Sequence, residues 1–341
     1  MAKYPKPRRK VHLVRDLGGP EISPTFSPSS DAVLFPGDCL DLLASMPSKS
    51  VQLVVTSPPY NIGKSYEKRA PLETYLAQQE AVIKECARVL SPGGSICWQV
   101  GNYIGKDEIV PLDIPLYAIF KNLGFNMRNR MVWHFEHGLH CSKRFSGRYE
   151  TICWFTKGDR YTFNLDPVRI PQKYPGKKYF KGPKAGQLSC NPLGKNPGDV
   201  WVIPNVKHNH VEKTIHPCQF PVELIERLVL AMTQPGDRVL DPFMGVGTTA
   251  VAAVMHKRKA VGAEVVPDYL KIARQRVELA AAGKLRTRPM DRPVYDPAKP
   301  YRNGTTRPHI VYQPGVDVQM MMLDSKRGRF RAVTVKEPAY A

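Results

Sequence analysis

Residues Val239-Leu240-Asp241-Pro242-Phe243-Met244-Gly245-Val246-Gly247-Thr248-Thr249 are followed by a run of small apolar residues, 250–254. Two apolar residues before a carboxylate and a proline are typical of the end of a buried strand. The two glycines let the backbone approach a ligand, and the next helix would point its free N–H groups at that ligand. We therefore expect a strand, a tight turn and a helix. Taken alone, the stretch fits both a ligand-binding loop and a plain connection.

Composition narrows the class of protein. The 341 residues include 50 Lys and Arg against 30 Asp and Glu, a formal net charge of +20. Such a charge attracts polyanions, so nucleic acid is the expected partner, ahead of an acidic protein or a membrane surface. No apolar run approaches the roughly 18 residues of a membrane span, so we expect a cytoplasmic protein. The seven cysteines are dispersed and form no Cys-x-x-Cys pair, which argues against a disulfide framework or a zinc ribbon.

The rest of the chain alternates strand and helix patterns. Strands are expected at 32–35, 51–55, 95–100, 131–133, 151–155, 239–241 and 260–264, and helices at 40–46, 72–90, 114–123, 221–232, 248–254 and 268–282. The first helix is expected to bury Leu40, Leu43 and Met46, and Pro221 suits the first position of a later one. This alternation predicts an α/β fold with a doubly wound, mostly parallel sheet.

A second unusual turn follows the apolar strand at 51–55. Residues 56–61 read Thr-Ser-Pro-Pro-Tyr-Asn, and two consecutive prolines make a stiff turn with predictable carbonyl directions. Tyr60 would stand at the carboxyl end of the strand, where ligands bind in open α/β sheets. A purely structural Pro-Pro turn is the alternative.

Three further segments bear on function. The strand at 260–264 ends in Glu264, about twenty residues beyond Gly245, where a carboxylate can accept hydrogen bonds from ribose hydroxyls. Residues 169–214 lack regular periodicity and carry nine Lys and Arg against two acidic residues, a pattern that suits phosphate contacts or a solvated insertion. The histidines of 134–141 have poor spacing for zinc and indicate a polar loop near the substrate.

These patterns divide the chain into five segments. We expect a flexible basic N-terminal tail at 1–30, a catalytic half at 31–168 and a DNA target-recognition insertion at 169–214. A cofactor-binding half at 215–283 and a basic extension at 284–341 are expected to follow. The extension has twelve Lys and Arg and five acidic residues, which favours an appendage over a second core.

Three motifs together resemble those of the AdoMet-dependent DNA amino-methyltransferases, which methylate adenine N6 or cytosine N4. The Asp241-to-Thr249 turn, Glu264 and the Ser57-Pro58-Pro59-Tyr60 turn each follow a predicted strand, and the resemblance spans roughly residues 30–282. Because the Pro-Pro-Tyr motif comes first and the cofactor motif last, the order resembles the β class, a circular rearrangement of the class I AdoMet-dependent methyltransferase sheet.

The resemblance implies a role for each motif residue. S-adenosyl-L-methionine would be the cofactor, with Glu264 on its ribose hydroxyls. The cofactor-binding residues would be Asp38, His216, Phe220, Pro221, Asp241, Phe243, Gly245, Gly247, Thr248 and Glu264, and the catalytic residues Ser57, Pro58, Pro59 and Tyr60. Contacts to double-stranded DNA are expected from Asn61, Lys64, Arg144, Arg169, Lys173, Lys177, Lys178, Lys181, Lys184 and Lys195. No metal is expected.

The chemistry explains these residue types. Hydrogen bonds from the exocyclic N–H groups to Ser57 Oγ and the Pro58 carbonyl would push the nitrogen toward tetrahedral geometry, so that its lone pair can attack the methyl group. The target base must leave the duplex, and Tyr60 offers a face on which it stacks.

The motifs leave the target base open. Many adenine enzymes of the family have Asp where this chain has Ser57, and Ser-Pro-Pro-Tyr is commoner among cytosine-N4 enzymes. Because Asn61 and the Ile62-Gly63-Lys64 continuation resemble adenine enzymes, we take adenine N6 as the first expectation and cytosine N4 as the alternative.

Other readings of the whole chain remain. A non-catalytic DNA-binding regulator on the same fold would be expected to have damaged motifs, and a methyltransferase for RNA or protein glutamine is a further rival. Relatives of the β class are often dimeric, which leaves monomer and homodimer open, and nothing indicates whether a restriction enzyme accompanies the protein.

Overall fold

The computed structural model describes residues 19–63, 69–105, 108–135, 138, 140–207 and 210–290, together with the backbone of strands at 309–310, 318–324 and 329–335. The strands of the main sheet are β1 (Ile22–Ser23), β2 (Ala32–Pro36), β3 (Val51–Thr56), β4 (Leu90–Val100), β7 (Phe125–His134), β8 (Tyr149–Lys157), β9 (Val200–Val202), β10 (Arg238–Asp241) and β11 (Lys259–Glu264).

These nine strands form one sheet in the order β1-β2-β11-β10-β3-β4-β8-β7-β9. Neighbours from β1 to β4 pair in parallel, β8 is antiparallel to both β4 and β7, and β9 pairs in parallel with β7. The predicted α/β class with a mostly parallel sheet is confirmed.

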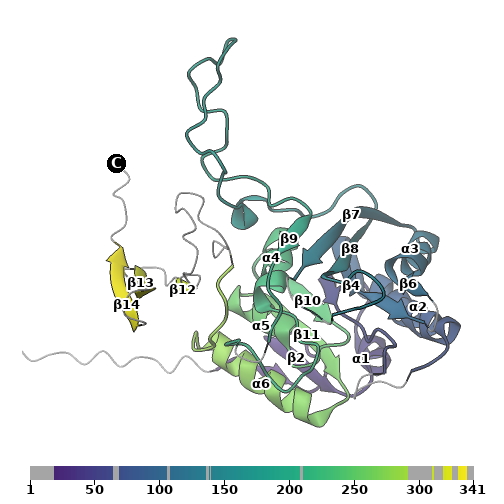
Figure 1. Cartoon of the computed structure of the whole chain (residues 1–341). Coiled ribbons are helices and arrows are strands. Elements are labelled where there is room, and N and C mark those ends of the chain that lie inside the picture. Colours follow the sequence, from purple (N-terminus) through teal and green to yellow (C-terminus); the bar gives the residue numbers. More distant parts are fainter. Residues whose placement is uncertain are drawn as a thin grey trace, which may run out of the picture.

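Helices cover both faces of the sheet (Figure 1). They are α1 (Cys39–Ser45), α2 (Leu72–Val89), α3 (Asp113–Asn122), α4 (Val222–Met232), α5 (Thr248–Met255) and α6 (Pro267–Ala281). Helices α1, α2 and α3 share one apolar core with one face of the sheet, whereas α4, α5 and α6 share the core on the other face. Strand β3 supplies Leu53 and Val55 to one core and Val54 to the other, which explains its nearly continuous apolar sequence.

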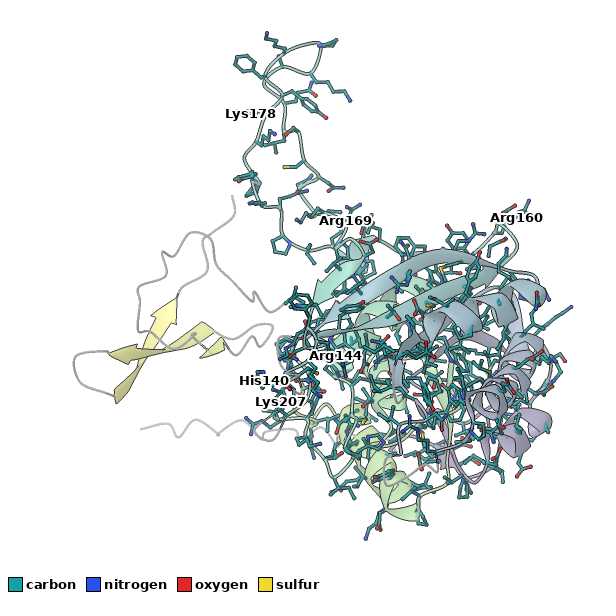
Figure 2. All side chains as sticks on the ribbon, turned by 45° about the vertical axis from the view of Figure 1, so that its right-hand side comes forward. His140, Arg144, Arg160, Arg169, Lys178 and Lys207 are labelled. Atoms are coloured by element: carbon teal, nitrogen blue, oxygen red, sulfur yellow. The ribbon has the colours of Figure 1, made fainter. Side chains whose placement is uncertain are left out.

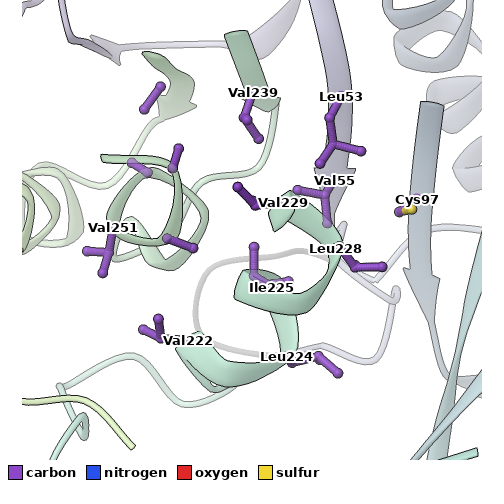
Figure 3. Close-up of a cluster of buried hydrophobic side chains, with 14 of the residues drawn as sticks. Leu53, Val55, Cys97, Val222, Leu224, Ile225, Leu228, Val229, Val239 and Val251 are labelled. Carbon is purple, nitrogen blue, oxygen red and sulfur yellow. The ribbon is translucent and has the colours of Figure 1, made fainter. Parts of the chain in front are cut away.

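Figure 3 shows how α4 closes one of these cores. Its Ile225, Leu228 and Val229, all buried, lie against β3 and β10, where Leu53 and Val239 project from the sheet. This is the apolar face that the spacing of α4 predicts. Because both cores continue across the central strands, the loops that leave those strands start from a rigid base.

The carboxyl ends of four neighbouring strands bring the sequence motifs together. The strand order places β2, β11, β10 and β3 side by side and parallel. Asp38 lies just beyond β2, Glu264 and Asp241 end β11 and β10, and Ser57 follows β3. Motifs that are far apart in the chain therefore meet at one edge of the sheet, where open α/β folds bind their ligands.

Several local expectations need correction. Leu40 is exposed, whereas Leu43 and Met46 are buried as expected, and Cys39 and Leu42 complete the buried face of α1. Pro221 is the N-cap of α4 and not its first helical residue.

The strand boundaries also differ from expectation. Strand β4 begins at Leu90, directly after α2, without an intervening loop. Strand β7 begins at Phe125, and the basic insertion contributes β9 to the sheet.

Three smaller features complete the description. Strands β5 (Asn102–Ile104) and β6 (Ile109–Pro111) form a hairpin, and a 3-10 turn spans Asp166–Val168. Near the C-terminus, β12 (His309–Ile310), β13 (Val318–Asp324) and β14 (Arg329–Val335) form an antiparallel sheet. Within the described residues, no helix has the length and apolar character needed to cross a bilayer. Of the flexible segment expected at 1–30, residues 1–18 lie outside the described residues, and Ile22–Ser23 form β1, which pairs with β2.

Candidate active site

A cavity of about 490 Å³ opens where the motif-bearing strands end. Its walls include most residues that the sequence singled out, namely Asp38, Ser57, Pro58, Pro59, Tyr60, His216, Phe220, Phe243, Gly245, Thr248 and Glu264. Three expected site residues, Asp241, Gly247 and Pro221, do not line the cavity. Asp241 ends β10, and Gly247 and Pro221 are the N-caps of α5 and α4. The size is in the range of small-molecule sites.

Asp241 ties the two halves of the site together. It is buried, and its carboxylate accepts hydrogen bonds from Thr56 Oγ1 at 2.6 Å, Thr249 Oγ1 at 2.6 Å and Phe243 N at 3.1 Å. Burial raises its pKa to about 6, although all three hydrogen bonds oppose that shift. Because Thr56 directly precedes Ser57, one carboxylate fixes the start of both functional loops.

The glycine turn has the backbone shape that only glycine adopts without strain. Gly245 and Gly247 have φ angles of +55° and +75°, in the left-handed region. A Cβ on Gly247 would lie 2.8 Å from the Cβ of Ala273 on α6. The turn is therefore set by close packing of α6 as well as by backbone conformation.

Arg276 holds the same turn from beneath. This arginine of α6 is buried, and its Nη1 donates to Val246 O at 2.6 Å and to Thr248 Oγ1 at 3.1 Å. Burial lowers its pKa to about 10, so the guanidinium remains charged at neutral pH. The sequence offered one signal for this residue, a lone charge on the apolar face of α6.

Two carboxylates stand at the rim of the cavity. Glu264 Oε1 accepts from Val266 N at 2.8 Å, and burial raises the pKa of this carboxyl. Asp38 Oδ1 accepts from Leu40 N at 2.7 Å as the cap of α1. Each carboxylate is thus oriented by its own backbone and offers acceptors toward the cavity.

His216 lies beneath the glycine turn as a neutral ring. Its Nδ1 accepts from Cys218 N at 3.2 Å, and its ring packs edge-on against Tyr269 at 4.7 Å. Burial, with help from Lys213 and Arg276, lowers its pKa to about 4. The ring also fills the space beside Gly245, where a Cβ would come within 3.3 Å of Nε2.

The other end of the cavity carries a network of polar side chains around Tyr60. Its hydroxyl lies 2.9 Å from Ser57 Oγ and donates to Glu150 Oε2 at 3.1 Å. Gln99 Nε2 donates to Glu150 Oε2 at 2.6 Å and to the Tyr60 hydroxyl at 3.3 Å. Gly101 makes room for the ring, since a Cβ there would lie 3.3 Å from Tyr60 Cε2.

Burial shifts both titratable groups of this network in the same direction. It raises the pKa of Glu150, against the hydrogen bonds from Gln99 and Tyr60, and it raises the pKa of Tyr60 well above its usual value. Tyr60 is therefore a protonated donor at neutral pH. Sequence reasoning missed Glu150 and Gln99, whose only signal was a polar residue inside an otherwise apolar strand.

The expected DNA contacts divide by position. Asn61 is buried. Its Nδ2 donates to Ala70 O and its Oδ1 accepts from Ala70 N, both at 2.7 Å, so the side chain fixes a loop and is not exposed for DNA. Arg169 is partly buried and donates to Asp166 at 2.6 Å and Gly194 O at 3.1 Å. Lys64 lies outside the described residues.

The remaining basic residues are exposed. Residues 169–199, here called the basic arm, extend away from the sheet as a two-limbed loop (Figure 1). Antiparallel bridges join Ile170 to Lys195 and Lys178 to Leu188. Figure 2 shows Lys178 far out on this arm, Arg169 at its root and Arg144 on a separate loop of the domain. Exposed lysines line the arm: Lys173, Lys177, Lys178, Lys181, Lys184 and Lys195.

No metal-binding cluster of His, Cys, Asp or Glu occurs among the described residues. The histidine segment is only partly described: His134 ends β7, and His140 is exposed. Of this segment, Phe135 and Gly138 line the cavity.

Comparisons with known proteins agree with this geometry. The family model of a DNA methylase matches residues 51–275. The chain is 55% identical to the type II methyltransferase M.BglII of Bacillus subtilis over 71% of this chain and 68% of that protein. It is 40% identical to M.ScaI of Streptomyces caespitosus over 80% and 88%.

Solved structures show the same fold. A candidate DNA modification methylase of Thermus thermophilus, solved with S-adenosyl-L-methionine, is 28% identical with a TM-score of 0.52, over 73% of this chain and 94% of that one. The PvuII cytosine-N4 DNA methyltransferase is 23% identical with a TM-score of 0.59, over 76% and 88%, and supports the fold alone.

Proposed function

Because this chain belongs to the family of N6-adenine and N4-cytosine DNA methyltransferases, we propose that it methylates the exocyclic amine of a base flipped out of duplex DNA. The cofactor of the family is S-adenosyl-L-methionine. The observation that carries the proposal is a single cavity that Glu264 and Phe243 line together with Ser57 and Tyr60.

The residues at the cofactor end fit S-adenosyl-L-methionine. When bound, the cofactor supplies an electrophilic methyl group on a sulfonium. The oriented Glu264 carboxylate suits ribose hydroxyls, and the Phe243 ring, held edge-on to Trp98 at 6.4 Å, offers an apolar wall. Gly245 and Gly247 leave the loop backbone bare where a side chain would meet His216 or Ala273.

At the acceptor end, the polar network fixes the direction of its hydrogen bonds. The hydroxyl of Tyr60 donates its one proton to Glu150, so the Ser57 hydroxyl, 2.9 Å away, donates in turn to Tyr60. The free lone pairs of Ser57 Oγ then face the cavity as acceptors. An amine N–H bonded there places its nitrogen lone pair for attack on the methyl group.

The same chain provides a path for the proton that must leave. The nitrogen lone pair would form the new N–C bond while the electron pair of the S–C bond stays on sulfur. The exocyclic amine of the base would then be methylated and would still carry one proton too many. Its proton passes to Ser57 Oγ as the Ser57 proton moves to Tyr60 and the Tyr60 proton to Glu150. Glu150 ends as a carboxylic acid, a form that its burial favours.

Adenine N6 and cytosine N4 each have one observation in their favour. The DNA adenine methyltransferase YhdJ of Escherichia coli is 32% identical over 72% of this chain and 82% of that protein, which favours adenine. Ser57 is the residue type that the resemblance associates with cytosine N4. Asn61 points into its own loop, so it favours adenine only through the resemblance of its residue type and of the Ile62-Gly63-Lys64 continuation to adenine enzymes.

The basic arm is the proposed element for DNA recognition. Its exposed lysines stand away from the cavity on a two-limbed loop, where they can neutralise phosphates of the duplex that presents the base. Replacing Lys177, Lys178 and Lys181 together with alanine should flatten the salt dependence of DNA binding by roughly one unit of slope per lysine. An unchanged slope would assign DNA binding to another surface.

The catalytic assignment is tested by methyl transfer from tritiated S-adenosyl-L-methionine to duplex DNA. Tyr60→Ala and Ser57→Ala should each lower single-turnover transfer by about 100-fold or more, with the fold intact by circular dichroism. Tyr117→Ala, at an exposed aromatic on α3, is the matched control. Full activity of both site variants would reject the assignment. We propose that this activity takes place in the cytoplasm.

A further inference from the structure

Among its described residues, the connection between β7 and β8 forms a surface projection whose two limbs stay together. Beyond the end of β7, Phe135 N donates to Arg148 O at 2.8 Å. A Cβ on Gly138 would lie 3.2 Å from Gly147 O, and Cys141 N donates to Ser146 Oγ at 3.0 Å. Residues 142–145 therefore form a tight tip, which we call the β7–β8 tip.

Phe145 stands at this tip with its whole side chain in solvent. Its relative exposure is 101%, the highest among the exposed large hydrophobic residues of the described chain. A phenyl ring held in water gives up the favourable burial that most phenylalanines have. A single exposed ring is common on protein surfaces, so its role depends on the residues beside it and on its place in the fold.

The root of the projection is the wall of the acceptor pocket. Phe135 and Gly138 line the cavity, and so does Glu150, one residue after the start of β8. The tip therefore extends from β8, which carries Glu150 of the Tyr60 network, and from β7, which pairs with β8. Arg144 is exposed on the domain, and Figure 2 shows it well separated from Lys178 on the arm.

The charge of the projection identifies the kind of partner. The connection, residues 135–148, contains Lys143, Arg144 and Arg148 and one acidic residue, Glu136. Lys143 and Arg144 are exposed beside Phe145. An aromatic ring between basic side chains suits a duplex, because the cations meet phosphates and the ring can enter between bases.

We propose that Phe145 enters the base stack of the duplex and fills the gap left when the target base turns into the cavity beside Tyr60. This inference rests on the proposed function, which requires an extruded base. Extrusion leaves an unstacked gap, and an apolar ring in that gap restores stacking for the neighbouring bases. Phe145 would therefore act on the extrusion step and not on methyl transfer itself.

Phe180 on the basic arm is the other candidate for this role. It is 89% exposed, and Lys181 Nζ lies 5.8 Å from the centroid of the Phe180 ring. However, it belongs to the arm, which extends away from the sheet (Figure 1), whereas the root of the β7–β8 tip lines the acceptor pocket. We assign the stacking role to Phe145 and use Phe180 as the matched control.

The test compares Phe145→Ala, Phe145→Trp, Phe180→Ala and the wild type on two duplexes. In one duplex the target base is paired, and in the other it lies opposite an abasic site, so that little pairing must be broken. Phe145→Ala should methylate the paired duplex at least roughly tenfold more slowly than the wild type and the abasic duplex at nearly the wild-type rate. Phe145→Trp should retain most activity on both duplexes, since it keeps an aromatic ring. Phe180→Ala should change the methylation rate by the same factor on both duplexes.

Other outcomes overturn the assignment. Equal loss on both duplexes would give Phe145 a role in folding or affinity, and no loss would give it none. Selective rescue of Phe180→Ala by the abasic duplex, without such rescue of Phe145→Ala, would move the stacking role to the basic arm. A wild-type enzyme that methylates neither duplex would refute the proposed function itself, and the role of Phe145 with it.

Discussion

Replacing Glu150 with glutamine keeps the size of the side chain and removes its charge, so it isolates the role of the carboxylate in the Tyr60 network. In the wild type, Glu150 Oε2 accepts from Tyr60 at 3.1 Å and from Gln99 at 2.6 Å. A hydrogen bond to a charged group contributes about 1.5–3 kcal/mol. Losing that contribution in the transition state would slow methyl transfer by roughly 10- to 150-fold.

The sign of the pH dependence follows from the raised pKa of Glu150. The chain of donors ends on an ionised carboxylate, so wild-type methyl transfer should fall as the pH drops through this raised pKa. Glu150→Gln has no carboxyl to titrate and should lose that inflection. Stability should change in the opposite sense, because ionising a buried carboxyl costs folding free energy, and the wild type loses stability relative to the variant as the pH rises above 4.5.

The assay is single-turnover methyl transfer across the pH range, with denaturant unfolding of the same variants. Glu80→Gln is the matched control, since Glu80 is partly exposed on α2 and pairs with Lys84. A slow, pH-independent Glu150→Gln with unreduced stability at neutral pH would support a role in the reaction. A Glu150→Gln enzyme with the wild-type rate and pH profile would refute the proton path.

Three further substitutions test other parts of the site. Glu264→Gln should weaken S-adenosyl-L-methionine binding by roughly 10- to 100-fold, because charged hydrogen bonds to the ribose are lost, and leave DNA affinity unchanged; calorimetry with each ligand checks both. Gly247→Ala should lower the free energy of unfolding by about 1–3 kcal/mol, and by more than Gly236→Ala. Gly236 also has a positive φ, but a Cβ there would meet nothing within 4 Å. Equal losses of unfolding free energy in denaturant would show that the Ala273 contact is unimportant. Thr249→Val removes one donor to Asp241 and should lower the free energy of unfolding by about 1.5–3 kcal/mol at neutral pH. This loss should shrink as the pH falls below about 6 and the Asp241 carboxyl is protonated. A pH-independent loss would show that it arises from packing.

The sequence predicted well the strand-to-helix turn at Asp241–Thr249 and its place at the cavity, because the determinants of that turn are local. Asp241, Gly245 and Gly247 lie in one strand-to-helix turn, and their residue types report the carboxylate and the positive φ angles directly. Glu264 follows from the next strand, and the parallel order of the strands brings it to the same cavity.

The acceptor end could be predicted only in part. Ser57 and Tyr60 belong to a recognisable motif, whereas Glu150 and Gln99 reach Tyr60 because β8 pairs antiparallel with β4. That pairing places Gln99 opposite Ile152 and joins residues about fifty positions apart in the chain. Local periodicity contains no information on strand pairing, so these two side chains were not identified from the sequence.

Asn61 shows a different limit. Its place directly after Tyr60 suggested a DNA contact, but its φ of +59° turns the side chain toward Ala70, where it closes a loop. Asn is one of the residues that tolerate this backbone conformation. A residue type that suits both base recognition and a tight turn cannot be assigned until its backbone angle is known.

The central claim is that the Ser57–Tyr60 end of the cavity directs methyl transfer to an exocyclic amine of DNA. The most direct measurement is to incubate the protein with S-adenosyl-L-methionine carrying a deuterated methyl group and unmethylated duplex DNA, then digest the DNA and identify the labelled nucleosides by mass spectrometry. We predict label in N6-methyladenine or N4-methylcytosine. Label in 5-methylcytosine, or DNA without label, would contradict the claim.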